Sequence, residues 1–435
     1  MVALVAGVVL GLAPQTAVAA TPGSDTVALS DWMGSLPGVA DTPLSELPIP
    51  GTHDSATSSL TADSPWSEAG RADFGDAALA FIPKAAAAAW SRAQPDSVGA
   101  QLRAGIRYLD LRLTQEPDQD VYLEHGLRGP ALTPVLTEIG DFARAHPREA
   151  VIVGLDRFSA FDDRGYGRVR DAVRAAFGDR LAPAALGAEV TLRQLWSAQR
   201  NVLLVDTSGR LADLGAYGGD AVYAPWPNTA DAGVTIAAAE KTMAGHDHGR
   251  FSVVGTALTP DAATIAGGLF RGVGSLAELT TRDGHPPIAS WLHELAPGRN
   301  LNVVTADWYA DPVCGTTFSR LVLSKVDGSA VPAPCDAWTS GSGTYWSWTD
   351  WTVHTWADLA WTPVSGASGY EVTLGGVAGC AGGTTETATT ASVRVDRPNR
   401  AGGEYLCRGS EYDLRVRART AAGWQPWSAV RRIRL

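Results

Sequence analysis

The chain has 435 residues, which is more than one hydrophobic core usually supports, so two or three domains are predicted. With 45% hydrophobic and 19% charged residues it has a globular composition, and its formal net charge of -11 argues against a nucleic-acid binder that neutralises phosphates. The same charge argues against tight electrostatic docking on an anionic membrane, although a local basic patch could still provide it.

The N-terminus predicts export. In residues 1–20 a short apolar run, Val2 to Leu12, is followed by the small residues Ala17-Val18-Ala19-Ala20. The run is too short to span a bilayer and is typical of a secretory signal peptide, so we expect a secreted, extracellular protein. Disulfides are the default in that compartment. Of the three pairings that four cysteines allow we prefer Cys314–Cys335 and Cys380–Cys407, because each closes a local loop.

The first informative stretch runs from Leu47 to Ser55. Leu47-Pro48-Ile49 predicts a short buried strand, and Gly51-Thr52-His53-Asp54-Ser55 then presents two titratable side chains. A histidine is useful there because its ordinary pKa of about 6.5 lies near neutrality. Helices are predicted before it, from Ser30, and after it, into Trp90 and over Ser97 to Ala104.

Further strands follow, and several end in polar residues. Ile106 to Leu113 alternates with period two, which predicts a strand with Asp110 and Arg112 on one face, about 6.5–7 Å apart. Val121 to Gly126 predicts the next strand, which carries His125 at its end. The remaining apolar strands are separated by predicted helices and span 150–155, 201–205, 252–255 and 301–306; the first, second and fourth are followed by Asp156, Asp206 and Asp307.

This alternation predicts an α/β fold with parallel strands. Six or seven such units in about 300 residues favour a closed or distorted (β/α) barrel of the TIM type, which we place over residues 30–336. In such barrels the chemistry lies at the C-terminal ends of the strands. The residues at or near those ends are His53, Arg112, His125, Asp156, Asp206 and Asp307.

The composition changes after residue 336. Residues 337–346 are rich in Ser, Gly and Thr and predict a linker. Residues 347–435 show period-two alternation, which predicts a small antiparallel all-β sandwich. It resembles a fibronectin type III module in Leu359-Ala360-Trp361, Gly369-Tyr370-Glu371-Val372 and Tyr412 to Ala418. Because it holds no catalytic constellation, we expect a spacer or an adhesion module for a surface glycan or protein.

Two histidines at separate strand ends form a natural acid–base pair, in which one takes a proton from a nucleophile and the other protonates a leaving group. The planar guanidinium of Arg112 suits a phosphate. This set, without a serine or cysteine nucleophile elbow, points to transesterification of a phosphodiester by a hydroxyl of the substrate. Asp307 could hold the tautomer of His53, and Asp54 could polarise His125 or anchor Arg112.

Four of these segments resemble the X domain of phosphatidylinositol-specific phospholipases C, most closely the compact stand-alone members: Leu47 to Ser55, Gly105 to Arg112, Leu123 to Gly126 and Val303 to Asp307. Trp226-Pro227-Asn228-Thr229 is similar to that group too. The resemblance implies a distorted TIM barrel and an enzyme, a phosphoric diester hydrolase or lyase. His53 would be the general base on the inositol 2-hydroxyl and His125 the general acid toward the diacylglycerol oxygen, giving diacylglycerol and a cyclic inositol phosphate.

The resemblance also bears on cofactors and binding. Arg112 stands where the metal-independent bacterial enzymes carry a phosphate-binding arginine, so no metal cofactor is expected. As an alternative, Asp54, Asp110 and Asp156 could assemble a weak calcium site. For His246 and His248 a solvated loop is favoured over a metal site. The expected substrate-binding residues are Asp110, Asp156, Asp206 and Trp226, although Asp156 and Asp206 stand where the small bacterial enzymes tend to place basic residues.

Two other functions stay open at this point. One is a non-catalytic secreted protein that binds lipid or glycan, although a binder has no need for two histidines at strand ends. The other is a phosphodiesterase for another glycerophospholipid. As partners we expect a membrane phospholipid substrate with peripheral contact to the bilayer, no nucleic acid, and a monomeric chain. Phe81, Ile82 and Trp90 could dip into lipid, or else pack on the barrel.

Overall fold

The computed structural model describes residues 26–261, 264–265, 273–311, 316–328, 337–347, 352–361, 367–378, 382–390, 392–398, 406–407, 410–420, 423–424, 427–428 and 430–435. The expected signal peptide lies outside them, as do Cys314, Cys335 and Cys380. Cys407 is disulfide-bonded, and both pairings stay predictions. None of the helices in the described ranges has the length and apolarity that crossing a bilayer would require.

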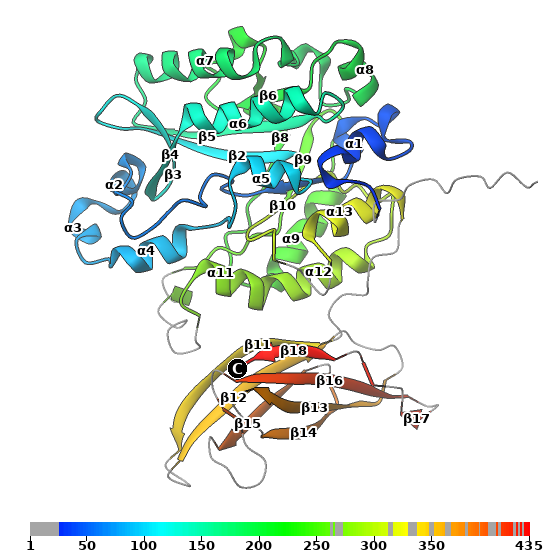
Figure 1. Ribbon diagram of the computed structural model, residues 1–435. Coiled ribbons are helices and arrows are strands. Elements are labelled where there is room, and N and C mark those ends of the chain that lie inside the picture. The colour runs from blue at the N-terminus through cyan, green and yellow to red at the C-terminus, as the bar shows by residue number, and fades with distance from the viewer. Residues whose placement is uncertain are drawn as a thin grey trace, which may run out of the picture.

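Eight parallel strands form a nearly closed barrel, in the order β7-β6-β5-β2-β1-β10-β9-β8. Figure 1 labels β2, β5, β6, β8, β9 and β10 among them. The predicted α/β barrel of the TIM type is therefore confirmed. The short strands β7 and β8 lie at the two ends of this order. The bounds are β1 Ile49–Thr52, β2 Tyr108–Gln115, β5 Val151–Ser159, β6 Val202–Asp206, β7 Tyr217–Gly218, β8 Val222–Tyr223, β9 Phe251–Gly255 and β10 Val303–Ala306.

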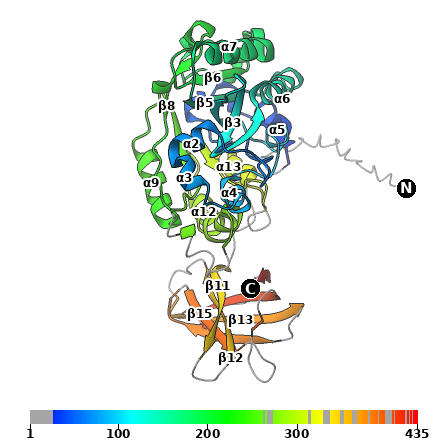
Figure 2. The ribbon, with the colours of Figure 1, turned by 90° about the vertical axis from the view of Figure 1, so that its left-hand side faces the viewer.

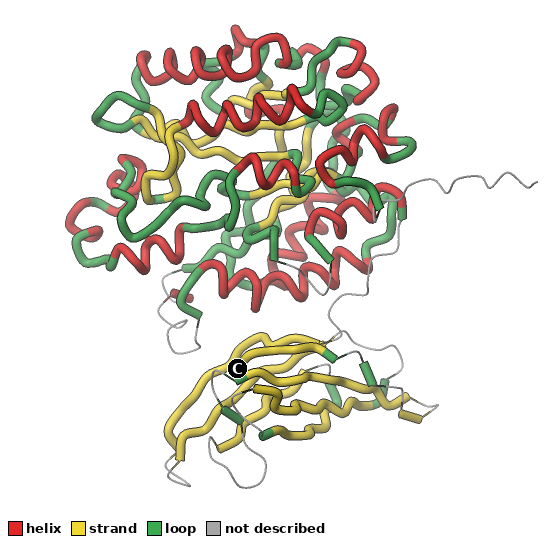
Figure 3. Tube along the Cα trace, viewed as in Figure 1, coloured by secondary structure: helices red, strands yellow, loops and turns green. Residues whose placement is uncertain are grey.

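Helices enclose these strands (Figure 3). The period-two pattern of β2 explains the layers, because Leu109, Leu111 and Leu113 face outward and pack in the core between the strands and helices such as α6 and α7. Tyr108, on the opposite face, packs in a second core cluster with Ile49 and other strand residues. The helices around the barrel include α5 Val98–Arg103, α6 Leu132–Ala145, α7 Asp163–Phe177, α8 Leu192–Ser197, α9 Ala232–Ala244, α12 His285–Glu294 and α13 Phe318–Asp327.

The strand that carries His125 is not part of the barrel path. β3 (Val121–His125) pairs antiparallel with β2 and with β4 (Leu127–Ala131), so the parallel pairing expected for it is wrong. The physical reason is the short link from Gln115 to Val121, since a parallel crossover needs about a dozen residues or more. The hairpin β3–β4 nevertheless brings His125 to the C-terminal side of the barrel strands.

An insertion of three short helices, α2 (Glu68–Phe74), α3 (Asp76–Leu79) and α4 (Lys84–Ser91), follows β1 and lies beside this hairpin (Figures 1 and 2). The Ser67 N–H donates to the Gly126 carbonyl at 3.2 Å. Gly70 permits this approach, because a Cβ there would lie 2.2 Å from the same carbonyl oxygen. The insertion and the hairpin thus form one packed unit.

The C-terminal part consists of two antiparallel sheets, which confirms the small all-β sandwich. Its core includes Trp361, Tyr370 and Tyr412. One sheet contains β11 (Ala337–Ser347), β12 (Thr352–Trp361) and β15 (Ser392–Pro398); the other contains β13 (Gly369–Ala378), β14 (Gly383–Ala388), β16 (Glu411–Thr420), β17 (Gly423–Trp424) and β18 (Arg431–Arg434).

The prediction of a linker over residues 337–346 is wrong. These residues belong to β11, which pairs antiparallel with β12 along its length. The register shifts between Thr339 and Gly341, which explains the glycine-rich composition, since glycine inside a strand often marks a bulge. Ser and Gly content alone could not distinguish a bulged strand from a flexible segment.

Candidate active site

Three neighbouring strands bring the predicted residues together. β1 lies between β2 and β10, with Thr52 opposite both Leu109 and Ala306. His53 follows β1 and Asp307 follows β10, so they meet although 254 positions separate them in the chain. Because β2 is the other neighbour, its inward-facing residue Arg112 also reaches His53.

The imidazole of His53 is held at both nitrogens. Its Nδ1 lies 2.9 Å from Asp307 Oδ1, and its Nε2 lies 2.7 Å from Arg112 Nη2. A carboxylate only accepts and a guanidinium only donates, so both are hydrogen bonds when the proton is on Nδ1 and the lone pair is on Nε2. Asp307 therefore selects the tautomer that a general base needs.

Opposing influences act on the protonation of His53, whose side chain is almost fully buried. Burial lowers the pKa of His53, but the Asp54 and Asp307 carboxylates outweigh it and raise the pKa from 6.5 to about 9. Arg112 acts in the opposite direction, as its charge favours the neutral ring. The hydrogen bond from Arg112 belongs to the neutral form of His53, and the two carboxylates stabilise the imidazolium that follows proton uptake.

Asp54 is the centre of the cluster and is 2% exposed. Its Oδ1 lies 2.8 Å from Arg112 Nε, and its Oδ2 lies 3.2 Å from the Nε2 atoms of both His53 and His125. Burial raises the pKa of Asp54, but Arg112 and the two histidines lower it to about 2 overall, so the carboxylate is ionised.

The backbone at Asp54 is unusual, with φ at +44°, a left-handed value that is uncommon outside glycine. The surrounding contacts maintain it: the Asp54 N–H donates to Asp110 Oδ2 at 3.2 Å, and the Thr57 hydroxyl donates to the Asp54 carbonyl at 2.8 Å. This turn directs the carboxylate back over the end of β1, between the two histidines.

His125 has a different arrangement. Its Nδ1 lies 2.7 Å from the carbonyl oxygen of Ser91, and its Nε2 lies 3.2 Å from Asp54 Oδ2. Both neighbours are acceptor oxygens, so a ring with a proton on each nitrogen would present one N–H toward each of them. That is the form of a general acid. The side chain is 26% exposed, and the ring centroid lies 6.2 Å from that of His53.

Arg112 contacts every charged member of the cluster except His125 and Asp307. Besides Asp54 and His53, its Nη2 lies 3.7 Å from Asp110 Oδ2. Burial, together with the neighbouring Asp54 charge, raises the pKa of Asp110 despite this arginine. The Arg112 side chain remains 21% exposed, so an incoming anion can reach it.

Of the predicted substrate-binding residues, some lie in the cluster around His53 and others lie outside it. Asp110 and Trp226 lie in the cluster, and Trp226 stacks on His53 with ring centroids 4.5 Å apart. Asp156 lies opposite Arg112 in the register of β2 and β5; it is exposed, and its carboxylate accepts from the Thr207 hydroxyl at 2.8 Å. It lies beside the cluster without contacting the histidines.

Asp206 does not join the site. It is 1% exposed, and its carboxylate accepts hydrogen bonds from the Ser208 N–H at 2.9 Å and the Leu211 N–H at 2.7 Å. These bonds close the turn after β6 and use both of its oxygens. The prediction that Asp206 binds substrate is therefore corrected, because a carboxylate at a strand end can equally be the residue that caps the following turn.

Two groups that hold the site residues in place were not predicted from the sequence. The fully buried Gln94 donates from Nε2 to the carbonyls of His53, at 2.7 Å, and Ala306, at 2.9 Å, and so fastens the ends of β1 and β10 to each other. Ser91 acts on His125 through its carbonyl, which any residue carries. A lone glutamine in a loop and a backbone acceptor follow no sequence pattern that could have revealed them.

The calcium alternative can be tested against this geometry. His53, Asp54 and Asp110 offer three ligand atoms within 4.8 Å of one another, but Asp156 is not in that group. Calcium takes six to eight oxygen ligands. Here the two carboxylates already face the guanidinium of Arg112, at 2.8 Å and 3.7 Å. The donor set therefore fits the fixed cation Arg112 better than calcium.

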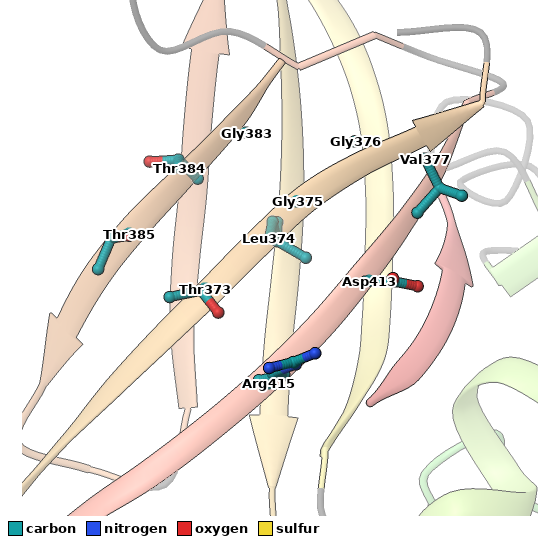
Figure 4. Close-up of a pocket in the computed structure, with 10 residues that line it drawn as sticks. All are labelled: Thr373, Leu374, Gly375, Gly376, Val377, Gly383, Thr384, Thr385, Asp413 and Arg415. Carbon is teal, nitrogen blue, oxygen red and sulfur yellow. The ribbon is translucent and has the colours of Figure 1, made fainter. Parts of the chain in front are cut away.

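A separate groove of about 510 Å³ lies on the sandwich (Figure 4). It follows β13, β14 and β16, and its polar side chains include Thr373, Thr385 and Arg415. Asp413 beside it pairs with Arg432 at 3.0 Å. Neither a histidine nor a second acid is among the residues that line this groove.

The chain is similar to a known protein family and to several known proteins. Residues 85–207 match the family model described as phosphatidylinositol-specific phospholipase C, X domain. PI-PLC X domain-containing protein 2 of Mus musculus is 33% identical over 295 residues, which cover 66% of this chain and 86% of the mouse protein. PI-PLC X domain-containing protein 3 of Danio rerio is 30% identical over 300 residues, which cover 67% and 92%.

Solved structures show the same barrel. A pentafluoro-Phe-containing phosphatidylinositol-specific phospholipase C from Staphylococcus aureus aligns with a TM-score of 0.51 at 15% identity, covering 68% of this chain and 97% of that one. A second structure of the S. aureus enzyme, from work on the modulation of its membrane binding, aligns with a TM-score of 0.51 at 16% identity, covering 68% and 97%. At this identity the match demonstrates the fold alone.

Proposed function

The chain belongs to the phosphatidylinositol-specific phospholipase C X-domain family, and we propose that it is a phosphodiesterase that cleaves phosphatidylinositol-type lipids by histidine acid–base transesterification. The observation that carries this proposal is the shared carboxylate oxygen, Asp54 Oδ2, at 3.2 Å from both His53 and His125, with Arg112 beside it. A base, an acid and a phosphate-binding cation therefore lie within reach of one reacting group.

The first step begins when the lipid phosphate binds Arg112. In the free protein Arg112 Nη2 lies 2.7 Å from His53 Nε2 and donates to it when the ring is neutral. An anionic phosphate oxygen is a stronger acceptor than an imidazole, so the guanidinium turns to the phosphate and leaves Nε2 bare. His53 then takes the proton of the inositol 2-hydroxyl, and the resulting oxygen attacks phosphorus. Asp307 and Asp54 stabilise the imidazolium that forms.

The leaving group is the glycerol oxygen of diacylglycerol. As its bond to phosphorus breaks, His125 donates the proton on Nε2 to it, and the Ser91 carbonyl keeps the ring oriented through Nδ1. Charge on the phosphoryl oxygens is balanced by Arg112, which replaces the divalent cation of a metal-dependent mechanism. The products are diacylglycerol and a cyclic inositol phosphate, and no metal is required.

Access to a bilayer is proposed through the helical insertion. Phe81 is 87% and Phe74 57% exposed, an unusual exposure for aromatic residues. Ile82 is half-buried, and Trp90 packs against a core cluster that contains Ala93, so of the three apolar residues expected at a lipid interface Phe81 is the most accessible. This exposure supports peripheral contact of the enzyme with the membrane. We further propose that the enzyme is secreted and monomeric, and that its sandwich contacts a surface glycan or protein.

The proposal is tested by incubating the mature protein with phosphatidylinositol vesicles, with and without EDTA, and following cyclic inositol phosphate by phosphorus NMR. We expect turnover that EDTA does not reduce and that His53→Ala and His125→Ala each abolish. Undiminished turnover in either variant would overturn the mechanism. A panel of glycerophospholipids identifies another head group as substrate, and vesicle binding without turnover of any lipid would favour the non-catalytic alternative.

A further inference from the structure

Trp226 covers one face of the His53 ring. The two ring centroids are 4.5 Å apart and the planes differ by 25°, which is a stacked arrangement. The contacts of His53 with Asp307 and Arg112 are made at its nitrogens and fix the edges of the imidazole, but do not by themselves fix its tilt. The indole supplies the missing restraint.

The indole is itself held firmly. Its Nε1–H donates to the Thr259 hydroxyl at 2.8 Å, and the Thr259 N–H donates to the Thr229 carbonyl at 2.7 Å, so the loop after β8 is tied to the loop after β9. Gly255, the last residue of β9, makes room for the ring, since a Cβ there would lie 3.0 Å from Trp226 Cζ3. A side chain fixed in this way at the barrel mouth, while still 38% exposed, is not explained by core packing.

We propose that Trp226 is a positioning residue for the general base: it holds the plane of the His53 imidazole and stabilises, with its π face, the imidazolium that forms when His53 accepts the substrate proton. This inference rests on the proposed function for its catalytic consequence. It differs from the expectation that Trp226 binds substrate, because its effect is on the rate and on the protonation of His53 rather than on affinity.

Three substitutions separate the effect of the π face of Trp226 from the effect of its hydrogen bond to Thr259. Trp226→Leu keeps an apolar side chain and loses the π face; Trp226→Phe keeps a π face and loses the bond to Thr259; Thr259→Val loses that bond alone. We expect kcat to fall about tenfold in Trp226→Leu, as for a lost cation–π contact, and only a few-fold in the other two, with KM nearly constant in all three. Trp196→Leu, a half-buried tryptophan of α8 whose indole donates to Arg148, is the control and should match wild type.

The pH profile provides a readout that a merely structural role would not change. The charged or titratable groups that face His53 are Asp307 after β10, Asp54 after β1, Arg112 and Asp110 on β2, and His125 at the end of β3, and none of them is altered. Losing the π face disfavours the imidazolium, so the acidic limb of kcat/KM should move to lower pH in Trp226→Leu and stay in place in Trp196→Leu.

NMR titration of the His53 ring protons gives the same information without turnover. We expect a lower titration midpoint and a lost ring-current shift in Trp226→Leu. An unchanged midpoint, or a raised KM with kcat and pH profile intact, would overturn the proposal. If wild type cleaves no inositol lipid, the proposed function fails, yet the titration still decides whether Trp226 acts on His53. Should Trp226→Leu not fold, Trp226→Met, a longer apolar side chain without a π face, carries the same comparison.

Discussion

Asp54 Oδ2 lies 3.2 Å from His125 Nε2, and the same oxygen lies 3.2 Å from His53 Nε2. One buried anion thus faces both the proposed base and the proposed acid. The negative charge of Asp54 favours a proton on either ring. When His53 takes up a proton and His125 releases one, the total charge around Asp54 stays the same. The two steps of the proposed reaction are thereby electrostatically balanced around one residue.

Asp54→Asn should therefore affect both histidines. The substitution keeps the shape and removes the charge that pairs with Arg112, His53 and His125, and we expect kcat/KM on phosphatidylinositol vesicles to fall about 10²–10⁴-fold, as for loss of acid–base assistance. Asp171→Asn, an exposed carboxylate on α7, serves as the matched control and should match wild type. Equal activity of the two variants would contradict this role.

Asp307→Asn should move the pH profile. Asp307 and Asp54 raise the pKa of His53 to about 9 against the effect of burial, so removing one of these charges lowers that pKa. The base acts in its deprotonated form, which is then populated at lower pH. The acidic limb of the kcat/KM profile should shift to lower pH, with a reduced plateau because the imidazolium loses a partner. A limb that stays in place would show that another group sets it.

Arg112→Lys should strongly reduce activity although it keeps the positive charge. A lysine retains one positive charge but cannot bond Asp54 at 2.8 Å and His53 at 2.7 Å while presenting a planar fork to a phosphate. We expect a loss of about 10²–10³ in kcat/KM, the usual cost of one preorganised charge stabiliser. Added calcium should not restore it. Arg128→Lys, on β4 with a distant partner at 3.8 Å, is the control.

Phe81→Ser should weaken membrane binding and leave the chemistry intact. Transfer of a phenylalanine side chain from water to an apolar phase is worth about 1.5–3 kcal/mol, so vesicle partitioning measured by sedimentation should fall about 10- to 100-fold. Thermal stability should change little, because this side chain is 87% exposed. Leu186→Ser, at an exposed apolar residue that ends the short 3-10 helix Ala184–Leu186, should partition like wild type. Unchanged partitioning of Phe81→Ser would exclude the insertion as the contact.

The barrel and most of the cluster were predictable because polar residues at the ends of apolar strands can be recognised in the sequence. His53, Arg112 and Asp307 lie at or near the ends of apolar strands, and parallel packing brings such ends together. The fate of Asp206 was not predictable in this way, since a strand-end carboxylate that caps a turn has the same sequence pattern as one that faces substrate. Only the hydrogen-bond partners distinguish the two.

Other features depend on contacts that local sequence does not specify. The hairpin that carries His125 could have been recognised from its short link to β2, whereas the clamp of Gln94 across two strand ends joins residues far apart in the chain. The strand over residues 337–346 was missed because small polar residues are common both in linkers and in bulged edge strands.

The antiparallel hairpin has a consequence for how the proposed activity could be altered. His53 is built into the nearly closed barrel, whereas His125 is carried by the hairpin and oriented by Ser91 at the end of the insertion. In the proposed mechanism the attacking half and the leaving-group half of the site are thus separable parts joined at Asp54. Grafting a different insertion and hairpin as one cassette offers a route to new leaving groups while the barrel keeps its own half of the chemistry.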